Sequence, residues 1–201
     1  RSGDFSISYI FIKTAFIKDD DQNSSSTFNT FINNRKVIRN RLNAINSVGE
    51  YGLNSQDVLI PAFVSAYSKS DPSNISLNPF IKSPLPNWRV TYDGLMKLKF
   101  IKKRFKQFSF GHAYRSTYTV GSYQTNLNYG DGDNVNLNNM SYHVQREISQ
   151  VSINEQFSPL FKLDMTWKNS LLTKIEFKRS RLFSLSLANN QLTETGSKEY
   201  V

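Results

Sequence analysis

The amino-acid sequence predicts a mainly β fold, a segment of a transmembrane antiparallel β-barrel with one or two short amphipathic helices in its connections. First, apolar and polar residues alternate over as many as about 17 residues, whereas a globular strand averages about 5 to 6. Second, the apolar parity is rich in aromatic side chains, which anchor membrane strands at the interfaces. Third, short turns alternate with longer polar loops. A sheet that separates lipid from water needs these properties.

The longest alternating segments lie in the second half of the chain. Residues 107–124 place Tyr114 and Tyr118 on one parity, with small or polar side chains on the other. Residues 161–167 and 171–187 predict a hairpin around a short turn. The apolar parity of this hairpin supplies the candidate membrane-facing residues, which are Phe161, Leu163, Met165, Trp167, Phe183, Leu185 and Leu187.

Two arginines interrupt the apolar parity of the return strand. Arg179 and Arg181 share the parity of Phe177 and Phe183. At the midplane of a bilayer each arginine would cost about 2–4 kcal/mol. We therefore expect both to lie at or beyond a membrane interface, or the parity to shift at a bulge near Ser180.

The first half of the chain predicts a different organisation. Alternation over residues 5–17 predicts a strand, apolar residues at helical spacing predict an amphipathic helix over residues 27–46, and the apolar stretch 55–68 predicts a short helix. Four prolines between Pro72 and Pro86 predict an extended connection. The chain then divides into a strand and polar loop (1–26), a helical and proline-rich insertion (27–86) and long antiparallel barrel strands with loops (87–201).

The predicted strands are too few to close a barrel. We expect about six, whereas the smallest single-chain outer-membrane barrels need about eight. Because the chain also opens at Arg1, we expect it to be an internal fragment of a longer protein. A soluble β-sandwich would show the same alternation, and it is the strand length that favours the barrel.

The charge is strongly positive, with 25 basic and 16 acidic residues and a net charge of +9. This charge admits a nucleic-acid module, but the basic residues gather in local groups that are typical of solvated faces or membrane-surface contacts. The group Lys97–Lys106 predicts a short basic helix. It supplies a candidate basic rim, formed by Lys102, Lys103 and Arg104, that lies against anionic headgroups, lines a cargo path or is merely a solvated face.

The sequence offers little for catalysis or cofactors. The chain has no cysteine, which excludes disulfides and thiolate metal sites. Neither His112 nor His143 has a neighbouring nucleophile or carboxylate at a catalytic spacing, so we interpret His112 as a wall residue with a satisfied hydrogen bond. Residues 131–134 begin like a calcium loop but lack its later ligands, which favours a turn in the exposed loop 129–139. We expect no enzyme activity and no cofactor.

Four stretches carry a family resemblance. They are QDVLIPAF (56–63), PLPNWRVTY (84–92), GHAYRSTY (111–118) and GSKEYV (196–201). Together they resemble the SprA/Sov family, the outer-membrane translocons of the type IX secretion system. The positions that match the family motifs are Pro84, Pro86, Trp88, Tyr92, Gly111, His112, Tyr114, Arg115, Tyr118, Glu199 and Tyr200.

The resemblance implies a function. Members of this family are very large barrels in the bacterial outer membrane that export folded cargo proteins from the periplasm to the cell surface, and they serve gliding motility where it occurs. The implied partners are cargo proteins with C-terminal sorting domains, the PorV shuttle protein, a periplasmic plug protein and outer-membrane lipid, but no nucleic acid. The alternatives are a soluble, surface-exposed β-sandwich binding module and a basic nucleic-acid module.

Overall fold

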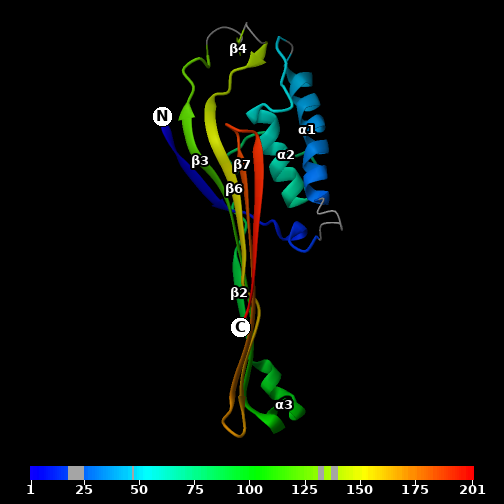
Figure 1. Ribbon diagram of the computed structural model, residues 1–201, viewed down its shortest axis with the longest axis vertical. Coiled ribbons are helices and arrows are strands. Elements are labelled where there is room, and N and C mark those ends of the chain that lie inside the picture. The colour runs from blue at the N-terminus through cyan, green and yellow to red at the C-terminus, as the bar shows by residue number, and fades with distance from the viewer. Residues whose placement is uncertain (18–24, 47, 131–133, 137–139) are drawn as a thin grey trace.

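The computed structural model describes residues 1–17, 25–46, 48–130, 134–136 and 140–201, and Figure 1 shows a long antiparallel sheet with helices beside it. The fold is mainly β. The strands are β1 (Ser2–Ser8), β2 (Trp88–Tyr92), β3 (Phe105–Thr125), β4 (Val135–Asn136), β5 (Ser141–Tyr142), β6 (Arg146–Trp167), β7 (Leu172–Ser186) and β8 (Gln191–Tyr200). The α-helices are α1 (Ser26–Ile45), α2 (Gln56–Ser68) and α3 (Lys99–Arg104), and short 3-10 turns cover Ile12–Thr14 and Gly94–Lys97.

The main sheet has the strand order β1-β3-β6-β7-β8, and β2 pairs with β3 as well. Strands β1 and β2 pair with successive parts of β3, at residues 117–124 and 110–114, so they lie end to end along one edge. Strand β8 forms the other edge, and neither edge has a further partner among the described residues. The sheet is therefore open rather than closed on itself.

Helices α1 and α2 cover one face of the sheet at one end, whereas α3 lies at the opposite tip (Figure 1). The Ser25 hydroxyl caps α1 by accepting a hydrogen bond from the Phe28 backbone N–H. Apolar residues at helical spacing in α1, including Phe31 and Ile38, are buried against α2. Helix α2 is apolar all round, and every residue from Val58 to Ser68 is buried, as expected of a helix enclosed between a second helix and a sheet.

Polar side chains hold the helical layer in register with the sheet. The Gln56 side-chain amide donates to the Arg146 carbonyl oxygen at 2.8 Å and accepts from the Ile148 N–H at 2.7 Å, so it extends the ladder at the start of β6. The buried Asn34 of α1 donates to the Ser65 hydroxyl of α2 at 2.8 Å. Burial makes each of these bonds costly to lose, because a buried polar group without a partner keeps its desolvation penalty.

Several predicted elements differ in extent from those observed. The first strand ends at Ser8 instead of continuing to Ile17, because residues 9–17 turn off the sheet and bury Phe11 and Ala15 on the helix-covered side. The hairpin arm predicted over 161–167 is the second part of a longer strand, β6, which begins at Arg146 and has extra residues between Phe157 and Phe161. The loop predicted over 129–139 lies partly outside the described residues, and its described part includes β4.

The core beneath the helices can be tested through one side chain. Ile38 is fully buried in α1, so Ile38→Ala is expected to lower the free energy of unfolding by about 2–5 kcal/mol. Ile45, at the end of the same helix, is 73% exposed, and Ile45→Ala is the matched control. Urea titration in a fixed detergent measures both, and equal losses would show that α1 does not pack as described.

Candidate membrane-facing surface

One face of the main sheet is apolar along its whole length. Strand β7 pairs with β8 without a shift of register from Phe177 to Ser186, so its odd-numbered residues share one face. At one end of that face Phe183 and Leu185 belong to the core beneath α2. Towards the other end the same face carries Phe177 and Ile175, beyond the reach of the helices.

We call the uncovered part of this face the apolar band. It is shared by five strands, because Tyr92 pairs with Phe110, Phe110 with Leu163, Leu163 with Ile175, and Phe177 with Tyr200. Its members are Val90, Tyr92, Phe108, Phe110, Phe161, Leu163, Met165, Trp167, Ile175, Phe177 and Tyr200. Phe161, Ile175 and Tyr92 are 38%, 42% and 52% exposed, so α1 and α2 do not cover the band. An uncovered apolar face of this kind marks a partner, a lipid phase or an aggregation hazard.

The opposite face is polar. Level with the helices it carries Thr117, Thr119, Ser152 and Asn154, and Ser6 of β1 lies 2.9 Å from the Thr119 hydroxyl oxygen. Level with the band it carries ion pairs, among them Lys174 with Glu176 at 2.8 Å and Lys162 with Asp164 at 2.6 Å. The three central strands β3, β6 and β7 therefore carry polar side chains on one face and mainly apolar side chains on the other.

The predicted membrane-facing residues fall into two groups. Phe161, Leu163, Met165 and Trp167 lie on the uncovered part of the apolar face, and their contact with lipid stays a prediction. Phe183 and Leu185 are 1% and 2% exposed beneath α2, and Leu187 packs against the same core, so the prediction that these three face lipid is wrong. Alternation identified the face correctly, but it carries no information on which apolar face another part of the chain covers.

A buried ion pair lies where the covered part of the face meets the band. Glu155 of β6 is fully buried, and one of its carboxylate oxygens accepts from Arg181 Nε at 2.8 Å and from Arg181 Nη2. Its other oxygen accepts from the Tyr114 hydroxyl at 2.7 Å. Arg181 also donates to the Thr14 carbonyl oxygen at 2.8 Å. Charge and hydrogen bonding are thus satisfied on both sides of the pair.

The structure decides one of the two expectations for the arginines, and their position at a membrane interface stays a prediction. The irregularity near Ser180 consists of extra residues in β6, between Phe157 and Phe161 opposite Arg179 and Phe177, and the parity of β7 does not shift. Arg181 keeps its place on the apolar face because Glu155 neutralises it. Arg179 lies half-buried, with its guanidinium 5.3 Å from the centre of the Phe16 ring. The sequence held a signal for the pair, since Glu155 is an acid between the apolar residues Ile153 and Phe157 of the same parity.

Of the family-motif positions, Tyr114 contacts this pair, and the others have different surroundings. Trp88 stacks on Tyr114 with ring centres 4.5 Å apart, and Tyr118 is fully buried in the core. Tyr200 stacks on Phe177 at 4.6 Å, and Glu199 pairs with Lys178 at 3.1 Å. The remaining positions have other surroundings: Gly111 lies beside Lys162, Tyr92 belongs to the apolar band, and Arg115, Pro84 and Pro86 are exposed.

His112 has the structural surroundings of a wall residue. Its Nδ1 lies 2.6 Å from the Leu160 carbonyl oxygen, which makes that nitrogen the donor, and its ring lies near Trp88 and Phe157. This matches the interpretation of a satisfied hydrogen bond. Among the described residues no group of three or more His, Asp or Glu side chains could hold a metal ion. Asp131 and Asp133 of the calcium-like stretch lie outside those residues.

A polar pocket of about 260 Å³ lies near the start of α2, between the helices and the 126–145 connection. It is lined by Tyr51, Asp57, His143 and Arg146, among others. Burial raises the pKa of Asp57 from 3.8 to about 6, even though the first turn of a helix favours a carboxylate. Burial, together with the nearby Asp57 charge, raises the pKa of Tyr51 to about 12.

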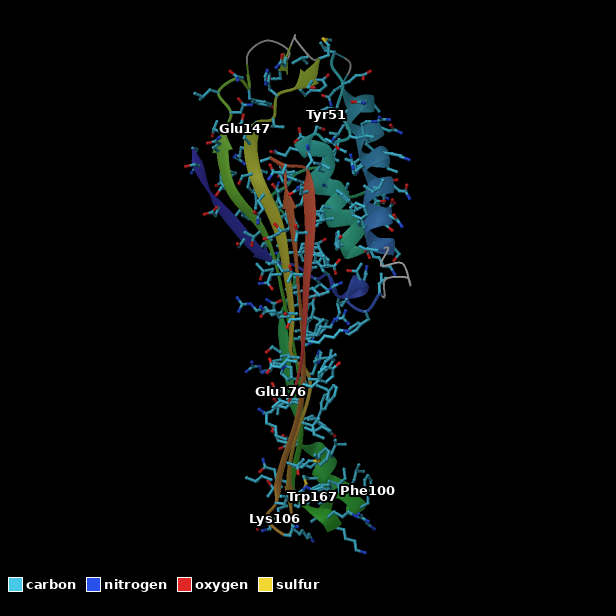
Figure 2. The ribbon with its side chains drawn as sticks, in the orientation of Figure 1. Tyr51, Phe100, Lys106, Glu147, Trp167 and Glu176 are labelled. Atoms are coloured by element: carbon cyan, nitrogen blue, oxygen red, sulfur yellow. The ribbon has the colours of Figure 1, made fainter. Side chains whose placement is uncertain are left out.

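The candidate basic rim lies at the far tip of the sheet. Lys102, Lys103 and Arg104 are exposed on α3, and in Figure 2 Phe100, Lys106 and Trp167 mark the same tip, at the opposite end from Tyr51. Trp167 packs on Phe105 with ring centres 4.3 Å apart. The rim is therefore continuous with the lower end of the apolar band.

Comparison with known proteins yields no assignment. No protein-family model matches the chain, and no curated protein sequence matches it. Among the described residues, no helix combines the length and hydrophobicity required to cross a membrane.

The buried pair can be tested by breaking it and then by removing it. Glu155→Gln leaves the Arg181 charge buried without a counter-charge, and we expect a loss of about 3–5 kcal/mol in the free energy of unfolding. Glu155→Leu combined with Arg181→Met removes both charges and is expected to be more stable than Glu155→Gln. Urea titration followed by Trp88 fluorescence reports both. The exposed pair supplies the control, since Glu199→Gln should cost no more than about 1 kcal/mol, and an equal loss there would contradict the role given to Glu155.

Asp57 predicts a dependence of stability on pH. Between about pH 4 and 6 the folded chain keeps the Asp57 proton that the unfolded chain has lost, so the free energy of unfolding falls as pH rises, by roughly 2–3 kcal/mol in total. Asp57→Asn should remove this fall and stabilise the protein above pH 6. Asp71→Asn is the control, because the Ser73 backbone N–H lowers the pKa of Asp71, so ionisation of Asp71 raises the free energy of unfolding as pH rises, the opposite of the effect of Asp57. Parallel pH curves for wild type and Asp57→Asn would refute the prediction.

Proposed function

We propose that the chain forms part of the wall of a protein-conducting channel in the bacterial outer membrane. The observation that carries this proposal is the uncovered apolar band on one face of long antiparallel strands, backed by a wet, charged face. A wall between lipid and an aqueous lumen needs this combination. The ten residues 158–167 of β6 match the 9–11 residues that a tilted strand needs to cross a bilayer.

The open edges of the sheet support the same proposal. In the described residues β8 and the β1/β2 edge present unpaired backbone groups, which soluble proteins usually protect. A barrel removes both edges by pairing each with a neighbouring strand. In the proposed wall, further strands lie beside β8 and beside β1 and β2.

The continuity of the apolar face supports a proposal for the position of the helices in such a wall. The apolar band and the α2-covered core share the odd-numbered face of β7. If the band meets lipid, then α1 and α2 lie on the outer side of the wall, beyond the edge of the bilayer, and not in the lumen. The lumen is lined by the face that carries Thr117, Asn154 and Lys162.

The particular system follows from the sequence resemblance. The four motif stretches resemble the SprA/Sov translocons, so we propose that the channel exports folded cargo proteins from the periplasm to the cell surface by type IX secretion. Its proposed partners are cargo with C-terminal sorting domains, the PorV shuttle and a periplasmic plug protein. The chain is proposed to act as a conduit and to perform no catalysis.

A soluble, surface-exposed binding module is the second candidate. The observation that favours it is the helical layer, which covers the upper apolar face as it would in a water-soluble domain. Among the described residues no second large sheet faces the first, so this candidate takes the form of a helix-covered sheet and not a sandwich. It leaves the apolar band without an explanation.

Single cysteines on neighbouring residues of β7 separate the two candidates. The chain has no cysteine of its own, so Ile175→Cys places one thiol on the band and Lys174→Cys places one on the opposite face. In intact outer membranes a membrane-impermeant maleimide should label Lys174→Cys through water and leave Ile175→Cys unlabelled until detergent is added. Equal labelling of both in membranes, or recovery of the native protein in the soluble fraction, would refute the channel wall.

A further inference from the structure

The tip of the sheet farthest from α1 and α2 combines dense positive charge with exposed apolar side chains (Figures 1 and 2). We define the basic tip as residues 94–106 and 168–172. It comprises the 3-10 turn, α3, the start of β3 and the β6–β7 turn. The turn and the helix are joined, because the Lys168 N–H donates to the Arg104 carbonyl oxygen at 3.1 Å and Lys106 Nζ donates to the Ser170 hydroxyl at 2.7 Å.

The charge of the basic tip is entirely positive. Its seven cations are all exposed, and no Asp or Glu occurs within either of its segments. They are Lys97, Lys99, Lys102, Lys103, Arg104, Lys106 and Lys168. A cluster of 4–8 Lys and Arg on or beside an amphipathic helix is the usual signature of recognition of anionic lipid.

Large apolar side chains project among these cations. Phe100 and Leu172 are 68% and 76% exposed, and Leu98 and Leu171 are 43% and 56% exposed. Only Ile101 of α3 is turned inwards and buried, so it fixes the helix to the sheet while Phe100 points outwards. A helix face exposed only to water would not carry this apolar surface. A cargo path lined by the same surface would bind unfolded segments of the cargo proteins.

A shallow hollow of about 330 Å³ lies between the two segments. Lys103, Arg104 and Lys168 converge on it, together with Asn169 and the indole of Trp167. The indole N–H of Trp167 donates to the Thr173 hydroxyl at 2.9 Å, so the ring contributes its apolar surface. Three cations beside an aromatic ring, at the boundary between wet and apolar surface, suit a phosphodiester headgroup whose acyl chains lie along the band.

We propose that the basic tip inserts into an anionic glycerophospholipid leaflet, with Phe100, Leu98, Leu171 and Leu172 at the depth of the glycerol backbone and the cations on the phosphates. The inference rests on the proposed channel wall. It selects the periplasmic leaflet, because the connections at the tip, 93–104 and 168–171, are shorter than the connections 9–87 and 126–145 on the far side of the band, and outer-membrane barrels keep their short turns on the periplasmic side.

The depth of two labelled residues tests this proposal. The native protein carrying Phe100→Cys, or Ile175→Cys on the band, is labelled with an environment-sensitive fluorophore and mixed with lipid, and the detergent is removed. The vesicles contain phosphatidylcholine alone, or with phosphatidylglycerol, or with lipid A. Lipids with a nitroxide near the headgroup or deep in the acyl chain act as quenchers.

We expect shallow quenching at residue 100 that is stronger with phosphatidylglycerol than without it, and deep quenching at residue 175 in every lipid. Each cation near an anionic leaflet strengthens the association of the basic tip with that leaflet about fivefold. Replacing Lys102, Lys103 and Arg104 together by Gln should therefore weaken this association roughly a hundredfold. The quenching at residue 100 should then no longer depend on phosphatidylglycerol. Lys174→Gln, a charge removed outside the basic tip, is the matched control.

The two residues separate the two proposals. Quenching at 175 without quenching at 100 overturns the basic tip and leaves the wall standing. Quenching at 100 alone supports the basic tip as a surface anchor and refutes the wall, and quenching at neither residue refutes both. Quenching at 100 with lipid A but not with phosphatidylglycerol would overturn the assignment to the phospholipid leaflet.

Discussion

The arrangement of this chain depends on the need to remove one continuous apolar face from water. Alternation along strands of 15 to 22 residues makes such a face unavoidable, because successive side chains point to opposite sides. Helices α1 and α2 cover the face over one part of its length. Beyond Phe157 the face stays apolar, but the helical layer ends. The molecule is therefore asymmetric along its long axis, with a finished core at one end and an uncovered band at the other.

The Glu155–Arg181 pair lies at the boundary between these two parts. A lone arginine on the apolar face would be costly in either environment, and the pair removes that cost only because its hydrogen bonds are complete. Tyr114 holds one carboxylate oxygen, and its hydroxyl in turn accepts from the Phe11 N–H at 3.0 Å. The Thr14 carbonyl oxygen accepts a hydrogen bond from Arg181, and the Thr14 hydroxyl donates to the Tyr67 carbonyl oxygen at the end of α2. One network thus joins β3, β6 and β7 to the segment that carries the chain from the sheet to the helices.

The local sequence pattern predicted the positions of the strands and helices well. It predicted poorly which part of the sheet the helices cover. Helix α1 begins and ends within one residue of its predicted limits, because its apolar spacing and the Ser25 cap are local properties. Phe183 and Leu185 lie under α2 because of contacts with residues more than a hundred positions away in the sequence. Alternation along a strand does not encode such contacts. The acid on the apolar parity of β6 and the arginine on that of β7 were both visible, and pairing opposite charges across neighbouring strands would have found the ion pair.

The same continuity of the face limits where the lumen of a channel can lie. A lumen that conducts folded proteins must be wet, and the face with Thr119, Ser152 and Lys162 is the wet one. The helices cannot lie on that face, because their apolar sides are already packed against Tyr118, Ile153 and Phe183 on the other. A plug made from α1 and α2 would have to exchange that core for water. In the proposed channel wall, the helices would therefore lie on the outer side, and any gate would be formed by other residues.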